Sequence, residues 1–128
     1  QRLDKFVTQR HILQKRYDSL LNDLAIIKPY QDQDNYSALH LYPIQVDLDS
    51  IDKSRQQIFD ELRQSGIGVN VHYIPIHTQP YYQQLGFQEG SFPNSEVYYD
   101  RAISIPLFHT MTLEQQDEVV NNLKSILI

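Results

Sequence analysis

The sequence predicts an α+β domain in which helices pack over one face of a small sheet. Amphipathic helical patterns occur near both ends of the 128-residue chain, and short apolar runs typical of strands lie between them. The predicted order is helix, strand, helix, strand, short helices, strand, helix. This order is typical of a layered α+β architecture, and the length suits a single domain with its own core.

A long amphipathic helix opens the chain. It ends before Pro29, because helices rarely continue into a proline, and over residues 1–24 it would span about 36 Å. Such a helix could lead in from another domain, so we assign residues 1–24 to a linking helix and residues 25–128 to the domain itself. Its apolar stripe exceeds what a small sheet can cover, which predicts an exposed seam. The apolar residues are Leu3, Phe6, Leu13, Tyr17, Leu20, Leu21 and Leu24.

A strand over residues 38–46 and a helix are predicted next. Pro43 removes a hydrogen-bond donor from the strand, which favours an edge strand or a bulge. Asp49 or Ser50 can cap the helix, and Gly66 is its stop signal. The buried face of this helix would carry Ile51, Ile58, Phe59 and Leu62.

Residues 69–75 (VNVHYIP) predict a second strand. Side chains alternate across a strand, so the residues divide between two faces. One face would carry Val69, Val71 and Tyr73, and the other would carry Asn70, His72 and Ile74.

Short elements follow this strand. Residues 80–85 predict a helical turn closed by Gly86. Asn94 or Ser95 would then cap a helix that runs through Ala102.

The chain closes with a strand and a helix. Residues 103–107 (ISIPL) predict a short third strand. Thr112 and Gln115 fit the capping-box pattern at the start of the terminal helix. The apolar face of that helix would carry Leu113, Val119, Val120, Leu123 and Leu127.

Composition excludes several classes of protein. The formal net charge of −5 argues against a general nucleic-acid binder, and the lack of cysteine excludes disulfides and thiolate metal sites. No apolar run approaches the length of a membrane-spanning helix, and no secretory signal opens the chain, so we expect a cytoplasmic protein with no membrane partner. The chain starts with Gln1 rather than Met, with a helical pattern already running, so we expect a piece of a longer protein.

The densest polar cluster is the segment HYIPIHTQPYY at residues 72–82. Its two histidines, His72 and His77, could bind a metal or transfer protons. However, no Asp or Glu lies between Glu61 and Glu89, so a third local metal ligand is missing. The alternative is a strand-to-turn segment whose histidines and tyrosines cap backbone groups and pack at a domain seam.

Other catalytic motifs are absent from the sequence. There is no GxSxG elbow, no GxGxxG loop and no GxxxxGK[ST] loop. The five lysines fall at positions where a solvated charge is expected. The residues by themselves therefore predict a soluble α+β domain with a strand end rich in His and Tyr.

Four stretches together resemble a known family. They are RLDKFVTQRHILQKRYDSLL (2–21), GIGVNVHYIPIHTQPYYQQLGF (66–87), FPNSEVYYDRAISIPLF (92–108) and MTLEQQDEVVNNL (111–123). In order and spacing they resemble the C-terminal part of the DegT/DnrJ/StrS family of sugar aminotransferases. The resemblance covers nearly the whole chain. It is nearest to the branch that aminates UDP-4-keto-6-deoxy-L-AltNAc on the pseudaminic acid pathway, and a related branch handles 4-amino-arabinose for lipid A.

The resemblance implies the C-terminal small domain of a fold type I enzyme that works as a homodimer. In such an enzyme a lysine of the large domain holds pyridoxal 5'-phosphate, glutamate donates the amine, and a UDP-ketosugar accepts it. The family's cofactor lysine, its pyridinium-binding acid and its phosphate-binding loop would all lie upstream. The resemblance therefore implies no catalytic residue and no metal ligand in this chain, and it implies that the chain alone is inactive.

The resemblance also suggests which residues approach the cofactor and the sugar. His72 matches the family histidine that closes over them, and Tyr73 and His77 follow in the same motif. His72 could donate to a sugar hydroxyl, a phosphate oxygen or the cofactor. Tyr81 and Arg101 are further candidates, although for Arg101 we favour a structural ion pair over a substrate contact.

Two other functions compete with this one. The chain could be a stand-alone α+β module that binds a protein or a metabolite without catalysis. It could also be a metal-dependent enzyme built on His72 and His77. Native chain ends at Gln1 and Ile128 would favour the first, and a stoichiometric metal would favour the second.

Overall fold

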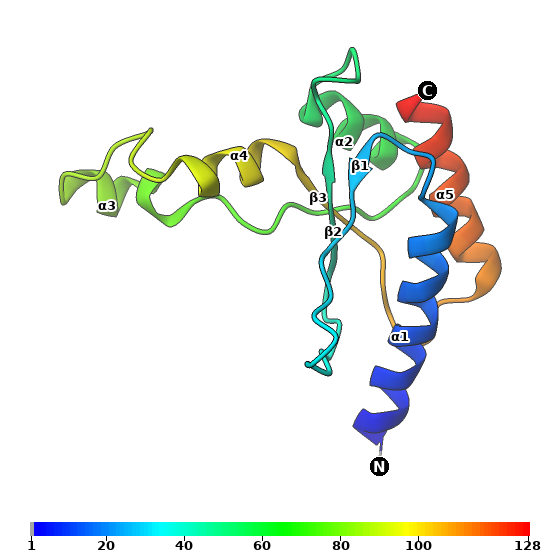
Figure 1. The fold of residues 1–128 in the computed structure, drawn as a ribbon. Coiled ribbons are helices and arrows are strands. Elements are labelled where there is room, and N and C mark those ends of the chain that lie inside the picture. Colours follow the sequence, from blue (N-terminus) through cyan, green and yellow to red (C-terminus); the bar gives the residue numbers. More distant parts are fainter. Residues whose placement is uncertain (1) are drawn as a thin grey trace.

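The centre of the molecule is a three-stranded antiparallel sheet with the strand order β1-β2-β3 (Figure 1). The structure is a computed structural model that describes residues 2–128. The strands are β1 (Ile26–Ile27), β2 (Tyr42–Val46) and β3 (Ala102–Ile105). The predicted α+β class with a small sheet is confirmed.

The two faces of the sheet differ. Partners that face each other across antiparallel strands share a face, so Tyr42 and Ile105 lie on one face and Pro43 and Ser104 on the other. The side chains on the face of Tyr42 are buried, and they pack in one hydrophobic core with side chains of the helices. Helices therefore cover one face of the sheet, as predicted.

Three helices supply that cover. They are α1 (Arg2–Leu20), α2 (Arg55–Gln64) and α5 (Leu113–Leu127), and α1 runs beside α5 (Figure 1). Gln116 on α5 is fully buried and donates to the carbonyl of Leu13 at 2.7 Å. Among residues 2–128 no helix is both long and apolar enough to cross a membrane.

The first helix differs from its prediction. It ends at Leu20 rather than at residue 24, and Leu13 and Tyr17 are completely buried. The prediction of an exposed apolar seam is therefore wrong for the C-terminal half of α1. There α5 packs against the helix and covers apolar side chains that the sheet does not cover. Leu3 remains 66% exposed at the other end. The assignment of residues 1–24 to a linking helix stays a prediction.

The position of Pro43 corrects another prediction. We expected an edge strand or a bulge, yet β2 is the central strand. The physical reason is that β1 is only two residues long and pairs with Gln45 and Val46. At the level of Pro43, β2 has a partner strand on one side only, and the proline can be accommodated there.

The residues that begin and end the helices agree only in part with the prediction. Ser54, not Asp49 or Ser50, caps α2 through a capping box with Gln57. Gly66 adopts φ +81° and ends α2 as predicted, with the paired hydrogen bonds of a Schellman motif. The capping box that begins α5, Thr112 with Gln115, is confirmed.

The expected strand at residues 69–75 does not form. Only Asn70 pairs with β3, in an isolated bridge to Ser104. The next pair in that register would join His72 to Ala102, but the Ala102 N–H already bonds to Tyr98 at the end of a helix. On the N-terminal side of the bridge, Gly68 would face Pro106, which has no N–H to donate.

Residues 71–101 form an arm that extends away from the sheet (Figure 1). The arm contains a 3₁₀ turn η1 (Ile76–Thr78), α3 (Pro80–Gln84) and α4 (Pro93–Arg101). Gly86 follows α3 at φ +96°, as predicted for its stop. Phe92 is the N-cap of α4, not Asn94 or Ser95, because Pro93 sets the first helical position.

Candidate functional site

His72 lies at the base of the arm, where the chain leaves the sheet. Its Nδ1 is 2.9 Å from the hydroxyl of Ser104, and its Nε2 is 3.3 Å from the side-chain nitrogen of Asn70. The ring is half-buried. Asn70 and His72 therefore lie together, as the predicted alternation required, although no regular strand forms.

Tyr73 projects from the same base. Its side chain is 71% exposed, and its ring lies nearly perpendicular to the His72 ring with a centroid distance of 4.7 Å. Tyr81, on α3, is 66% exposed and packs edge-on against Tyr82. Both tyrosine hydroxyls are on exposed side chains, so they are free to meet a ligand or another protein surface.

His77 occupies a different place from His72. It is almost fully buried inside the arm, and its Nε2 lies 2.6 Å from Oε1 of Glu96. The carboxylate of Glu96 also accepts hydrogen bonds from the backbone N–H groups of Gly90 and Phe92. His77 thus holds the arm together, and the structure does not bring it into one constellation with His72.

The surroundings of Glu96 favour its charged form. Desolvation acts to raise its pKa, but the hydrogen bond from His77 and those from Gly90 and Phe92 outweigh it. The pKa of Glu96 is therefore lowered from the ordinary value. Within residues 2–128 no group of three or more His, Asp or Glu side chains is arranged to hold a metal ion.

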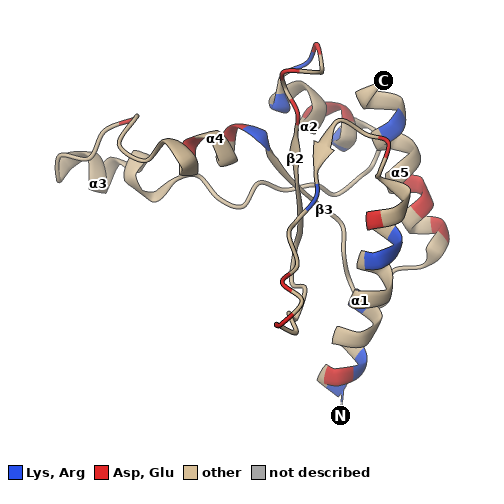
Figure 2. Ribbon diagram, viewed as in Figure 1, with Lys and Arg blue, Asp and Glu red and all other residues tan. Residues whose placement is uncertain are grey.

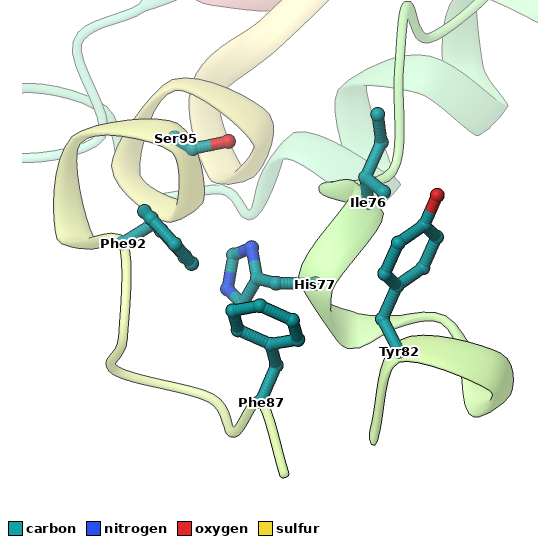
Figure 3. Close-up of a pocket in the computed structure, with 6 residues that line it drawn as sticks. All are labelled: Ile76, His77, Tyr82, Phe87, Phe92 and Ser95. Carbon is teal, nitrogen blue, oxygen red and sulfur yellow. The ribbon is translucent and has the colours of Figure 1, made fainter. Parts of the chain in front are cut away.

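An apolar pocket of about 330 Å³ opens beside His77 (Figure 3). The His77 and Phe92 ring centroids are 4.9 Å apart, and those of Phe87 and Phe92 are 6.1 Å apart. Sequence reasoning missed this pocket, because its rings recur every five residues, a spacing typical of neither a helix nor a strand. The pocket is lined by Ile76, His77, Tyr82, Phe87, Phe92 and Ser95.

Arg101 lies where α4 meets β3. Its guanidinium pairs with the carboxylate of Asp49 at 3.0 Å, the kind of structural ion pair that we favoured for it. Asp49 is largely exposed, so this contact adds little stability.

Charged residues are sparse on the arm (Figure 2). No lysine occurs between residues 71 and 101. Elsewhere, Lys53 pairs with Glu61 at 2.7 Å, and Lys28 donates to Asn22 and to the carbonyl of Asp18. The arm therefore offers imidazole and phenol groups but no amine that could bond to the aldehyde carbon of pyridoxal phosphate. Its donor set fits covering a bound cofactor, not attaching it.

The fold and the residues of the arm agree with one family of proteins. The family model for the DegT/DnrJ/EryC1/StrS aminotransferase family matches residues 1–124, and the chain belongs to this family. The family uses pyridoxal phosphate.

Individual relatives support the same conclusion. The spore coat polysaccharide biosynthesis protein SpsC of Bacillus subtilis is 35% identical over 128 residues, which is 98% of this chain and 33% of SpsC. The apo form of "Putative sugar aminotransferase Spr1654" from Streptococcus pneumoniae is 27% identical, with a TM-score of 0.88 over 98% of this chain and 31% of that one. Spr1654 also has solved PLP and PMP forms.

A further structure shares the fold. The aminotransferase PseC of Helicobacter pylori, involved in pseudaminic acid biosynthesis, is 24% identical, with a TM-score of 0.85 over 95% of this chain and 33% of that one. This chain spans about a third of the length of these relatives.

Proposed function

We propose that this chain is the C-terminal small domain of a pyridoxal-phosphate-dependent sugar aminotransferase. The observation that carries the proposal is the match of residues 1–124 to the family model. The superposition on Spr1654 over 98% of the chain supports it, since that protein is described as a sugar aminotransferase and has solved cofactor forms. We propose that the whole protein works as a homodimer, as the family resemblance implies.

We further propose the substrates. The amino donor is glutamate, and the acceptor is C4 of a UDP-4-keto-6-deoxy sugar of the pseudaminic acid type. The support is the likeness of the segment at residues 66–87 to that branch of the family. The shared fold with PseC is compatible with this choice of acceptor.

The chain's own residues have a supporting part in this reaction. When bound, pyridoxal phosphate supplies the electron sink that amino-group transfer requires. His72 and Tyr73 stand at the base of an exposed arm, where they can contact the sugar or the cofactor, fix its orientation and exclude water. No lysine lies near them in the sequence, so the attachment of the cofactor falls to another part of the protein.

The test uses the full-length protein and this chain side by side. Each is incubated with pyridoxal phosphate, desalted, and given glutamate and UDP-4-keto-6-deoxy-L-AltNAc. We expect the full-length protein to retain the cofactor absorbance and to form the 4-amino sugar with one equivalent of 2-oxoglutarate, read by mass spectrometry. The 128-residue chain should do neither. A full-length protein that retains no cofactor and aminates no ketosugar would contradict the proposal.

A further inference from the structure

The side-chain amide of Asn70 has a fixed orientation. Its Oδ1 accepts a hydrogen bond from the backbone N–H of Val71 at 2.8 Å. A backbone N–H can only donate, so the oxygen of the amide must face Val71. The NH₂ group must then face the His72 ring, 3.3 Å from Nε2.

This orientation decides where His72 carries its proton. An amide NH₂ only donates, so Nε2 must accept and therefore holds the lone pair. A neutral imidazole has one protonated nitrogen, which is then Nδ1. Nδ1–H donates to the hydroxyl oxygen of Ser104 at 2.9 Å.

The register of the backbone explains the arrangement. Asn70 and Ser104 exchange both backbone hydrogen bonds, at 3.2 and 2.8 Å, so their side chains stand opposite each other on one face. His72 is two residues further on and reaches back diagonally to Ser104. Ser104 is only 5% exposed and lies on the sheet face that the core helices do not cover.

We propose that Asn70 and Ser104 are positioning residues that hold His72 as the Nδ1–H tautomer, with Nε2 as its accepting nitrogen. The contact that this tautomer makes with a ligand rests on the proposed function. A histidine held in this way accepts a hydrogen bond from a hydroxyl or an ammonium group and does not donate to a phosphate oxygen. The ligand group at His72 is therefore a donor such as a sugar hydroxyl. It takes the place of the Asn70 amide at Nε2, while the hydroxyl of Ser104 still accepts from Nδ1–H.

The tautomer can be read directly in this chain. Long-range ¹H–¹⁵N correlation spectra of the ¹⁵N-labelled protein, at a pH where the ring is neutral, should show Nδ1 of His72 protonated and Nε2 unprotonated. Asn70→Asp is nearly isosteric and still accepts from Val71, but a carboxylate offers Nε2 no donor. In this variant we expect Nε2 to gain the proton. A wild-type His72 that is protonated on Nε2, or an unchanged ring in Asn70→Asp, would overturn the proposal.

A second pair of variants tests Ser104. Ser104→Ala removes the acceptor at Nδ1 and should reduce the Nδ1–H population, whereas Ser104→Thr keeps a hydroxyl and should restore it. His77 is the internal control, because its Nε2 faces Glu96 and its spectrum should not change in any variant. If Asn70→Asp fails to fold, the wild-type spectrum and the two Ser104 variants still decide which nitrogen of His72 carries the proton.

Kinetics of the full-length enzyme test the consequence. In Asn70→Asp, Nε2 no longer accepts, so kcat/KM for the ketosugar should fall about ten- to hundredfold. Unchanged kcat/KM together with a reversed tautomer would overturn the role of His72 as an acceptor. Failure of the proposed function has a different signature, since a wild-type enzyme without transaminase activity would still give the His72 spectrum.

Discussion

His77 and Glu96 join the two sides of the arm. The Nε2 of His77 lies 2.6 Å from Oε1 of Glu96, although 19 positions separate the two residues in the chain. His77 comes from η1 and Glu96 from the first part of α4, and the chain between them carries α3 and a loop. Between residues 71 and 100 only Pro75 and His77 are buried, so few apolar contacts share in holding the arm.

Removing the charge of Glu96 should loosen the arm without unfolding the domain. In Glu96→Gln the backbone N–H groups of Gly90 and Phe92 keep an acceptor, but the charge-assisted bond to His77 is lost. We expect the amide hydrogens of Gly90 and Phe92 to exchange roughly tenfold faster or more. Core amides such as that of Ile44 should be unaffected. Glu89→Gln, an exposed change on the same loop, is the matched control, and equal effects from both would contradict this role.

The arm should also loosen at acid pH. Glu96 has a lowered pKa in the folded protein, against an ordinary value of 4.5. The ionised carboxylate therefore stabilises the arm above the unfolded-state pKa, and this stabilisation is lost as the pH falls through the lower folded-state pKa. Hydrogen exchange or amide chemical shifts of Gly90, followed from pH 6 downward, should show opening below about pH 4.5. This dependence should be absent in Glu96→Gln, and its persistence there would assign it to another group.

His72→Asn tests whether His72 serves the reaction or the fold. The ring is half-buried and bonded to Ser104 outside the helical core, so the melting temperature should change little. In the full-length enzyme we expect kcat/KM to fall about 10- to 1,000-fold, because a positioning contact is lost. Calorimetry and steady-state kinetics on one preparation separate the two effects. A large loss of stability with unchanged kcat/KM would remove His72 from the site.

The cap of α2 offers a test of local structure. Ser54→Ala removes the hydroxyl that accepts from the Gln57 N–H and should cost about 1 kcal/mol of unfolding free energy, measured by urea denaturation. Ser50→Ala is the control, because Ser50 only bonds to Asp47 in the preceding turn and should cost less. A larger loss from Ser50→Ala would show that the helix begins earlier than Ser54.

The elements that sequence analysis predicted correctly depend on residues close together in the chain. The capping box of α5 joins Thr112 to Gln115, three positions away, and the end of α2 needs only the positive φ of Gly66. The terminal helices follow from a repeated apolar spacing. Such signals are complete within one or two turns, so they can be recognised without knowing what the element packs against.

The strand at residues 69–75 shows where that approach fails. Its alternation is that of a strand, but pairing requires free N–H groups on a neighbour 32 positions away. The next partner of the predicted strand is Ala102, and its N–H already bonds to the carbonyl of Tyr98 in α4. Pro43 shows the reverse error, because a proline that looked unsuited to a central strand is tolerated there. Whether its missing N–H disrupts the sheet depends on how far β1 extends, which the sequence of β2 does not reveal.

The sequence by itself determined the family, the α+β class, the helices at both ends and the segment that carries the candidate residues. The tertiary structure alone decided how those residues divide: His72 turns back to Ser104 in the sheet, while His77 is buried against Glu96 in the arm. It also created the aromatic pocket of Phe87 and Phe92. The physical reason is that a hydrogen bond or a ring contact needs two groups within a few ångströms, and chain folding, not spacing along the sequence, brings these groups together.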